Sequence, residues 1–284
     1  MNIKEIEELI EEGESLKAIA QAYSEIANIK IKRIRAQTER NRIFFQEIAY
    51  IYGLVKKLAN TKKISIVKPK KTISLIITSN YRFYGSINSG LLDYFVKSTR
   101  KTDTDIIALG KAAINNFKTT KVFSGYREIL LKDDQPNPAE LAMLADILKD
   151  YSQILVFYSV MKSLLVQQPT VLNLADTLKN FDQSNRTDFA GQEGFRFIFE
   201  PDLEKMLIFF DSSIITLLLE STFLESELAR TASRFISMDS AETEANAFIK
   251  DQLKLKAHAK RDEDNNDILE NFASQIGSRL DSYV

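Results

Sequence analysis

Hydrophobic residues recur at intervals of three and four toward the C-terminus, which predicts a long α-helix. The predicted stripe comprises Leu207, Phe210, Ile214, Leu217, Leu224, Leu228, Phe235, Met238, Ile268, Phe272, Ile276 and Leu280. No glycine lies between Gly194 and Gly277 and no proline follows Pro201, so one helix from Leu203 to Leu280 is expected. At 1.5 Å per residue it would be on the order of 115 Å long, against a radius of gyration of about 19 Å for a compact domain of this size. Such a helix must project from any globular part.

The N-terminal segment offers this helix a partner. Ser15 to Leu58 contains no proline and only Gly53. Its apolar positions are Leu16, Ile19, Tyr23, Ile26, Phe45, Ile48, Tyr52 and Val55. Because most helical stability comes from packing an apolar face, the simplest arrangement is an antiparallel two-stranded coiled coil of the first and last segments. Basic residues between positions 30 and 35 interrupt the stripe and predict irregular pairing there.

Strand and helix patterns alternate in the middle of the sequence. Strands are predicted at residues 71–79, 151–160 and 194–201, with a weaker one at 119–126. Amphipathic helices are predicted at 90–98, 104–118 and 138–151, and a polar loop at 181–194. This alternation is typical of a small α/β domain with a mostly parallel sheet. The expected fold is therefore α/β plus a long antiparallel coiled coil, with a Rossmann-like body inserted between two terminal helices.

Composition narrows the possible classes of protein. The 284 residues are 44% hydrophobic and 27% charged, with a net charge of −1, so no overall charge draws the protein onto nucleic acid. The absence of cysteine excludes disulfides, thiolate catalysis and Cys-ligated zinc. The acidic N-terminus does not resemble a signal peptide, and we identify no run near the roughly 20 apolar residues of a membrane span. A cytoplasmic protein is expected, which could still attach to a membrane complex.

One glycine pair suggests a phosphate-binding loop. Gly85 and Gly90 follow an apolar run at Ile73–Ile77, as in a nucleotide-binding strand and loop. A phosphate loop needs Lys and Ser or Thr directly after its second glycine, whereas Leu91 and Leu92 follow Gly90. We therefore interpret the segment as a strand-to-helix turn.

Two further candidate sites are weak. Asp262, Asp264 and Asn266 have the spacing of a calcium loop, but Asp267 and Ala273 replace the required Gly and Glu. His258 is the only histidine, and no second metal ligand of the His or Cys type lies near it in the sequence. A helical surface is the better interpretation of both, and no metal or other cofactor is expected.

Several motifs resemble the gamma subunit of F-type ATP synthases. "FIFEPDLEKML" is similar to that family's strand exit, with Glu200 and Pro201 in register. "ESELARTASRFISMDSAETEANAFI" resembles its last helix, and "SLKAIAQAYSEIANIKIKRIRAQ" its first helix. The matched positions there are Glu227, Ala229, Arg234, Met238, Ala241 and Asn246, with Lys17, Ala22, Ala27 and Lys30. "QQPTVLNL", with Gln168, Pro169 and Leu174, resembles the loop before the family's last strand.

The resemblance implies a rotor shaft without catalytic activity of its own. Residues 1–60 and 202–284 would be the shaft helices and 70–200 the α/β body. In this family ATP is made or hydrolysed in a ring of alternating alpha and beta subunits, and gamma couples proton or sodium flow through the membrane rotor to that ring and regulates its ATPase activity. The implied location is the cytoplasmic face of the cell inner membrane, as a peripheral membrane protein.

The resemblance also implies partners and contact residues. The partners are the alpha and beta subunits, the epsilon subunit and the membrane c-ring, with no nucleic acid and no small-molecule substrate. Residues implied to contact the alpha-beta ring are Lys30, Lys32, Arg33, Arg35, Arg234, Met238, Asn246, Arg261, Asp262 and Asn266. The basic group 30–35 has a simpler interpretation as a solvated helix face.

The turn after the first strand departs from the family pattern. Where the family has Asp and Gly, this sequence has Asn80 and the bulky residues Arg82, Phe83 and Tyr84. A divergent member is implied, and three alternatives stay open. They are a rotor not coupled to ion transport, a coiled-coil adaptor, and an enzyme with a nucleotide site in the α/β body.

Overall fold

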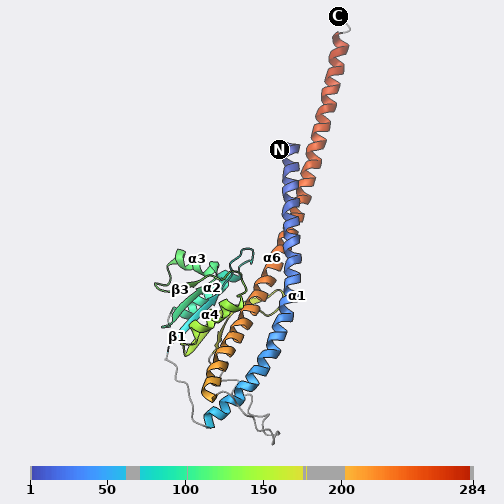
Figure 1. The fold of residues 1–284 in the computed structure, drawn as a ribbon. Helices are drawn as coiled ribbons and strands as arrows, with labels where there is room; N and C mark the ends of the chain where they lie inside the picture. Colours follow the sequence, from blue (N-terminus) through green and yellow to red (C-terminus); the bar gives the residue numbers. More distant parts are fainter. Residues whose placement is uncertain (1, 62–70, 101, 175–176, 178–201, 282–284) are drawn as a thin grey trace. The chain divides into compact units, whose positions relative to one another are not determined.

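The computed structural model describes residues 2–61, 71–100, 102–174, 177 and 202–281 (Figure 1). The elements are α1 (Ile3–Thr61), β1 (Thr72–Ile77), α2 (Ile87–Thr99), β2 (Asp105–Leu109), α3 (Lys111–Thr120), β3 (Arg127–Ile129), α4 (Pro138–Leu148), β4 (Gln153–Met161), β5 (Gln167–Asn173) and α6 (Leu203–Asp281). The structure divides into unit 1, residues 1–26 with 235–284, and unit 2, residues 27–234. Helices α1 and α6 contribute to both units. The predicted boundaries at 1–60, 70–200 and 202–284 stay a prediction.

Unit 2 contains a five-stranded sheet in the order β3-β2-β1-β4-β5. Strand β1 pairs in parallel with β2 and β4, and β5 is antiparallel to β4. Successive residues of β1 point into different hydrophobic cores. Leu75 packs in a cluster with residues of α1, α4 and α6, and Ile76 packs with residues of α2 and α3. Both faces are therefore covered, as a mainly parallel sheet requires. The predicted fold class is confirmed.

Three predictions inside the body are wrong. Residues 104–118 form strand β2 and helix α3, and not one helix. Gly110 separates them with φ of +95°, where an added Cβ would lie 2.4 Å from the Thr78 carbonyl oxygen. The weak strand at 119–126 is the end of α3 and a loop, and β3 follows at Arg127–Ile129. Gln167–Asn173 is the edge strand β5, where the resemblance implied a loop. The predicted strand 194–201 and loop 181–194 lie outside the described residues.

Helix α6 contains an apolar run that the sequence analysis did not identify. Within Leu203–Ala273 an 18-residue window reaches a mean hydropathy of 1.7, which meets the length and composition of a membrane span. Half of that window is buried inside the structure. Core packing of unit 2 accounts for this hydropathy, because Ile214, Leu218 and Phe223 are buried against the sheet.

In unit 1 the first part of α1 pairs antiparallel with α6, and the C-terminal end of α6 continues past the start of α1 (Figure 1). Glu7 forms an ion pair with Lys256 at 2.8 Å, and Gln21 donates a hydrogen bond to Glu242 at 2.7 Å. The predicted antiparallel pairing is thus confirmed, because a step forward along α1 matches an equal step backward along α6.

The buried face of α1 in unit 1 is not the predicted one. Leu16, Ile19 and Ile26 are 63%, 53% and 55% exposed. The buried positions are Ile6, Gly13 and Ala20, seven residues apart. This small-residue seam, defined as Ile6, Gly13 and Ala20, brings the helices close, since a Cβ on Gly13 would lie 2.9 Å from Ile249 Cγ1. In unit 2 the predicted stripe holds: Tyr52 and Val55 are buried, and Phe45 and Ile48 pack against the core.

Candidate functional site

The turn at the carboxyl end of β1 occupies the position where open α/β sheets bind ligands. Strand β1 lies between β2 and β4, so the order of the strands reverses at this point of the sheet. Ligands of such sheets bind in the crevice outside the carboxyl ends of the strands at this switch point. We define the switch-point turn as residues 80–85.

A buried carboxylate, Asp134, holds the inner side of the switch-point turn. Its Oδ1 accepts a hydrogen bond from the Asn80 backbone N–H at 2.6 Å, and its Oδ2 accepts from the Tyr84 hydroxyl at 2.6 Å. Arg230 of α6 lies beside it, with Nε 4.0 Å from Oδ2. Both charged residues are buried, at 3% and 2% exposure. A buried carboxylate needs such a partner, because desolvation of an unpaired charge is costly.

Helix α6 holds the outer side of the same turn. Ser233 Oγ donates to the Tyr84 carbonyl at 2.7 Å, and Arg234 donates to the Arg82 carbonyl at 3.0 Å. The Arg234 guanidinium also lies 4.0 Å from the centroid of the Tyr84 ring, a cation–π distance. Burial, and then the Asp134 carboxylate, raise the pKa of the Tyr84 hydroxyl, which therefore stays a proton donor.

These contacts show what the switch-point turn does chemically. The Asn80 N–H that could face a phosphate donates to Asp134, whose own carboxylate would repel an anion. Phe83 and Gly85 adopt φ of 66° and 57°, a left-handed conformation that is uncommon for a bulky residue such as Phe83. Tyr81 and Phe83 remain 53% and 59% exposed. The turn thus anchors the sheet to α6 and presents two aromatic side chains outward.

Further charged groups join helix to helix and helix to sheet in unit 2. Lys30 forms an ion pair with Glu227, whose side chain is 2% exposed. The Tyr52 hydroxyl donates to Asp211 at 2.7 Å, and the Tyr158 hydroxyl of β4 donates to Glu225 at 2.9 Å. Burial raises the pKa of Glu225, and the Tyr158 hydrogen bond offsets part of that shift. Charged residues therefore lie inside the apolar contact of α6 with its neighbours.

The ten predicted contact residues divide by environment. Arg234 and Lys30 make the intramolecular contacts described above, and Met238 is partly buried. The exposed members are Lys32, Arg33, Arg35, Asn246, Arg261, Asp262 and Asn266. The structure brings none of these seven into a site with one another in the part of the protein that it describes. Their contact with a partner stays a prediction.

Sequence reasoning missed Asp134 and Arg230, and it identified Tyr84 only as a bulky residue of the turn that departs from the family pattern. One sequence signal was available for Arg230: it is a charged residue between the small residues Ala229 and Ala232, both of which the structure buries. No local signal identified Asp134, which lies on a loop and meets Arg230 only in the folded protein. Among the described residues no group of three His, Asp or Glu side chains is placed to hold a metal ion, and His258 is exposed.

Comparison with known proteins gives a consistent result. The sequence model of the ATP synthase family matches residues 2–270. The ATP synthase gamma chain of Desulforudis audaxviator is 23% identical, and the match covers 93% of that protein and 92% of this one. The ATP synthase gamma chain of Malacoplasma penetrans is 26% identical, with the same two coverages of 93% and 92%.

Solved structures show the same fold. A subunit of the Euglena gracilis mitochondrial ATP synthase, in a structure of OSCP, F1 and c-ring, matches with a TM-score of 0.65 at 16% identity. The match covers 97% of that subunit and 100% of this protein. A subunit of the Tetrahymena thermophila mitochondrial ATP synthase central stalk and c-ring matches with a TM-score of 0.56 at 20% identity, over 99% of that subunit and 78% of this protein.

Proposed function

The protein belongs to the ATP synthase gamma-chain family, whose members form the central stalk of F-type ATP synthases, and we propose that it couples ion flow through a membrane rotor to ATP synthesis. In this proposal it turns inside a ring of alpha and beta subunits, regulates their ATPase activity, and contacts the epsilon subunit and the membrane c-ring. The protein itself performs no catalytic step. The complex lies at the cytoplasmic face of the inner membrane.

The exposed apolar surface of unit 1 supports a role inside a ring. Leu16, Ile19 and Ile26 face away from the helix seam, and Leu253 and Leu255 of α6 are 50% and 47% exposed. Large exposed apolar side chains are groups that a partner surface can cover. We propose that the alpha-beta ring covers this surface.

The final segment of α6 supports contact with the ring through polar groups. Lys256 of α6 forms an ion pair with Glu7, which lies near the start of α1. The residues after Lys256 therefore lie beyond this ion pair. Every residue from Lys260 to Ala273 is exposed. Arg261, Asp262 and Asn266 lie in this segment, where we propose that they form hydrogen bonds to the ring, while Lys32, Arg33 and Arg35 face acidic loops of the beta subunits.

The proposed mechanism is mechanical. A helix pair that is not cylindrically symmetric makes different contacts with each catalytic subunit as it turns. A subunit shifts between open and closed states only as far as its contacts differ between those states. Torque requires a stiff rod, and the proline-free, glycine-free sequence from 202 to 276 provides one without kink sites.

Reconstitution tests this function. Co-expression with alpha and beta subunits should yield a complex of three alpha, three beta and one gamma, and vesicles containing the membrane sector should couple ATP hydrolysis to ion uptake. Met238→Pro should abolish coupling, because an interior proline costs a helix about 3 kcal/mol or more. Met238→Leu is the matched control and should retain coupling. Coupled activity in the proline variant would refute the shaft function.

A further inference from the structure

Helix α6 passes from unit 2 into unit 1 after Arg234, because unit 2 ends there and Phe235 belongs to unit 1. Torque that enters the shaft from the α/β body through α6 must therefore enter it at or before Arg234. Apolar residues of α6 such as Leu207 and Phe223 pack in the core of the body. Polar contacts with the body come from α6 residues close to the boundary, which are Glu225, Arg230, Ser233 and Arg234.

Two of these residues hold the backbone of the switch-point turn on both sides of Phe83. Ser233 Oγ donates to the Tyr84 carbonyl at 2.7 Å, and Arg234 donates to the Arg82 carbonyl at 3.0 Å. Phe83 lies between these carbonyls with φ of 66°, a conformation that a bulky residue keeps only where its surroundings hold it. A rotation of α6 against the turn would distort both hydrogen bonds.

The other side of the switch-point turn is fixed to the body. The Asn80 side chain donates to the Leu131 carbonyl at 3.1 Å, and its Oδ1 accepts from the Lys111 N–H at 3.1 Å. Asp134 accepts from the Asn80 N–H and from the Tyr84 hydroxyl, each at 2.6 Å. A force on the turn is therefore passed to the sheet and its loops.

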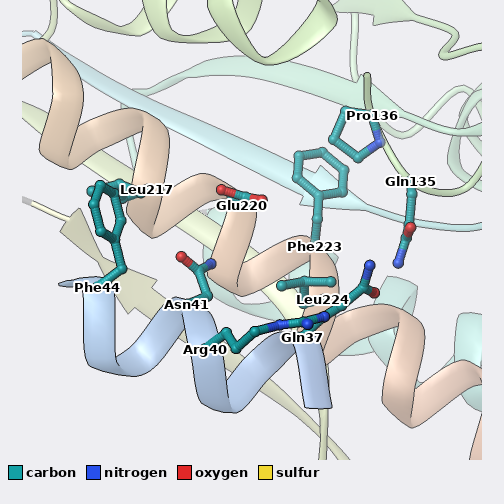
Figure 2. A pocket seen from close by; sticks show the side chains of 10 residues that line it. All are labelled: Gln37, Arg40, Asn41, Phe44, Gln135, Pro136, Leu217, Glu220, Phe223 and Leu224. Atoms are coloured by element: carbon teal, nitrogen blue, oxygen red, sulfur yellow. The ribbon is translucent and has the colours of Figure 1, made fainter. Parts of the chain in front are cut away.

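The loop that carries Asp134 is also held in place. It leads into α4, whose first turn is closed by a capping box between Asn137 and Glu140. Pro136 of this loop and Phe223 of α6 line the same groove, which Figure 2 shows. Asp134 thus lies on a loop that is anchored to α4 at one end and lies beside α6.

Polar and apolar contacts resist a rotation of α6 in different ways. Apolar attraction is non-directional, so it sets no particular rotation angle. A hydrogen bond weakens steeply as its angle departs from linearity, so two hydrogen bonds to one backbone turn define an angle. The contacts of Ser233 and Arg234 therefore fix the orientation of α6 relative to the body.

We propose that torque passes between the α/β body and α6 through these contacts, which we call the torque joint and define as residues 80–85, Asp134, Arg230, Ser233 and Arg234. The inference rests on the proposed function and goes beyond it, because a stiff shaft could be driven from any point of its contact with the body. Tyr84 contributes both its hydroxyl and its carbonyl to the joint, and it lies in the turn that departs from the family pattern.

The torsional stiffness of the assembled complex tests the torque joint. The protein has no cysteine, so Ser98→Cys on the exposed surface of α2 gives a single attachment point for a bead on the body. With the alpha-beta ring fixed to a surface and no nucleotide present, the variance of the bead angle is inversely proportional to stiffness. Ser233→Ala combined with Tyr84→Phe removes two hydroxyls of the joint and should raise this variance about twofold or more.

Three controls separate the joint from general stability of the fold. Ser233→Thr keeps the hydroxyl and should retain the wild-type variance. Lys118→Gln breaks an exposed ion pair with Glu128 inside the body and should also retain it. Ile114→Ala removes buried apolar atoms from the core on α2 and α3, so it should lower Tm without changing the variance.

The outcomes separate this inference from the proposed function. A wild-type variance in the double variant, or an equal rise in Ile114→Ala, would overturn the torque joint while the complex still forms. If the double variant does not assemble, Ser233→Ala alone keeps both carboxylate contacts of Asp134 and should still raise the variance; an unchanged value would overturn the joint. Failure of the wild-type protein to assemble with alpha and beta subunits would overturn the proposed function instead.

Discussion

Unit 1 and unit 2 use the same two helices in different ways. In unit 2 the large apolar residues Leu219 and Phe223 of α6 are fully buried against the sheet. In unit 1 the helices cover only each other, and Ala245 is the one buried residue among the described α6 residues beyond Arg234. Large side chains are buried where the sheet covers the helix. Small side chains are buried where the two helices pack only against each other.

The charged groups differ in the same way. Unit 2 buries Arg230 and Asp134 together, whereas unit 1 keeps its ion pair between Glu7 and Lys256 partly exposed. Loss of one partner of a buried ion pair destabilises the folded state, because the other partner stays desolvated. An exposed ion pair contributes little to stability. The comparison predicts effects of very different size in the two units.

The largest effect is expected for Asp134→Ala. This variant leaves Arg230 buried without its carboxylate and releases the switch-point turn, so the free energy of unfolding should fall by about 3 kcal/mol or more. Urea unfolding followed by circular dichroism measures the change. Glu7→Gln, which breaks the exposed pair of unit 1, is the control and should show no measurable change. Equal effects of the two variants would contradict the contrast between the units.

The next largest effect is expected for Gly13→Leu in unit 1. The position leaves no space for a Cβ beside Ile249, so the new side chain should separate the helices and destabilise unit 1 by about 1–3 kcal/mol. Faster amide hydrogen exchange of residues 3–26 would report this. Glu14→Leu introduces the same residue type at an exposed neighbouring position and should leave exchange unchanged. Protection equal to wild type in Gly13→Leu would refute the small-residue seam.

A smaller effect on stability, but a clear one on assembly, is expected for Leu16→Ala combined with Ile19→Ala. Both side chains are exposed, so each substitution should change the free energy of unfolding by less than about 0.5 kcal/mol. Affinity for the alpha-beta ring should fall several-fold. Met143→Ala removes an exposed apolar side chain from α4 of unit 2 and serves as the control. Unchanged ring affinity in the double variant would argue against unit 1 as the covered surface.

The smallest effect is expected for Glu225→Gln, which should change how Tm depends on pH. Burial raises its folded pKa above the ordinary value of 4.5, so the folded state binds more protons than the unfolded state above that pH. The contribution of this carboxyl to stability is full below pH 4.5 and is lost as pH rises through the raised pKa. Glu225→Gln should therefore raise Tm relative to wild type at pH 7, with a difference that disappears near pH 4.

The control for this measurement is Glu204→Gln, an exposed carboxyl on the same helix. Its Tm difference from wild type should not vary with pH. A Glu225→Gln difference that stays constant from pH 4 to pH 7 would show that burial of this carboxyl does not shape the pH profile.

Sequence predicted the long elements well and the short ones less well. The start of α6 at Leu203 was predicted correctly, because Pro201 is the last proline and no glycine follows it before Gly277. Strand β2 was missed, since a short apolar run such as 106–109 cannot be told from helix by periodicity alone. The small-residue seam was missed for a different reason: hydrophobic patterns give most weight to large side chains, and Gly13 or Ala20 carry little signal.

The candidate site was less predictable than the fold. Arg234 was identified through family resemblance, but its contact with Arg82 and Tyr84 depends on a turn that departs from the family pattern. Asp134 contacts Asn80, which lies 54 residues away in the sequence, and Arg230, which lies 96 residues away. Such contacts depend on the tertiary arrangement, which periodicity and composition do not determine.

Pairing between the N-terminal and C-terminal helices also has a consequence for biosynthesis. Gln21 meets Glu242, which is 221 positions later in the sequence. At about 5–20 residues per second, a ribosome needs roughly 10–45 s to make the intervening residues. Throughout this interval the nascent N-terminal segment lacks its partner helix. Glutamates at positions 5, 7, 8, 11, 12 and 14 give that segment a negative charge, and we expect this charge to oppose aggregation until the last helix leaves the ribosome.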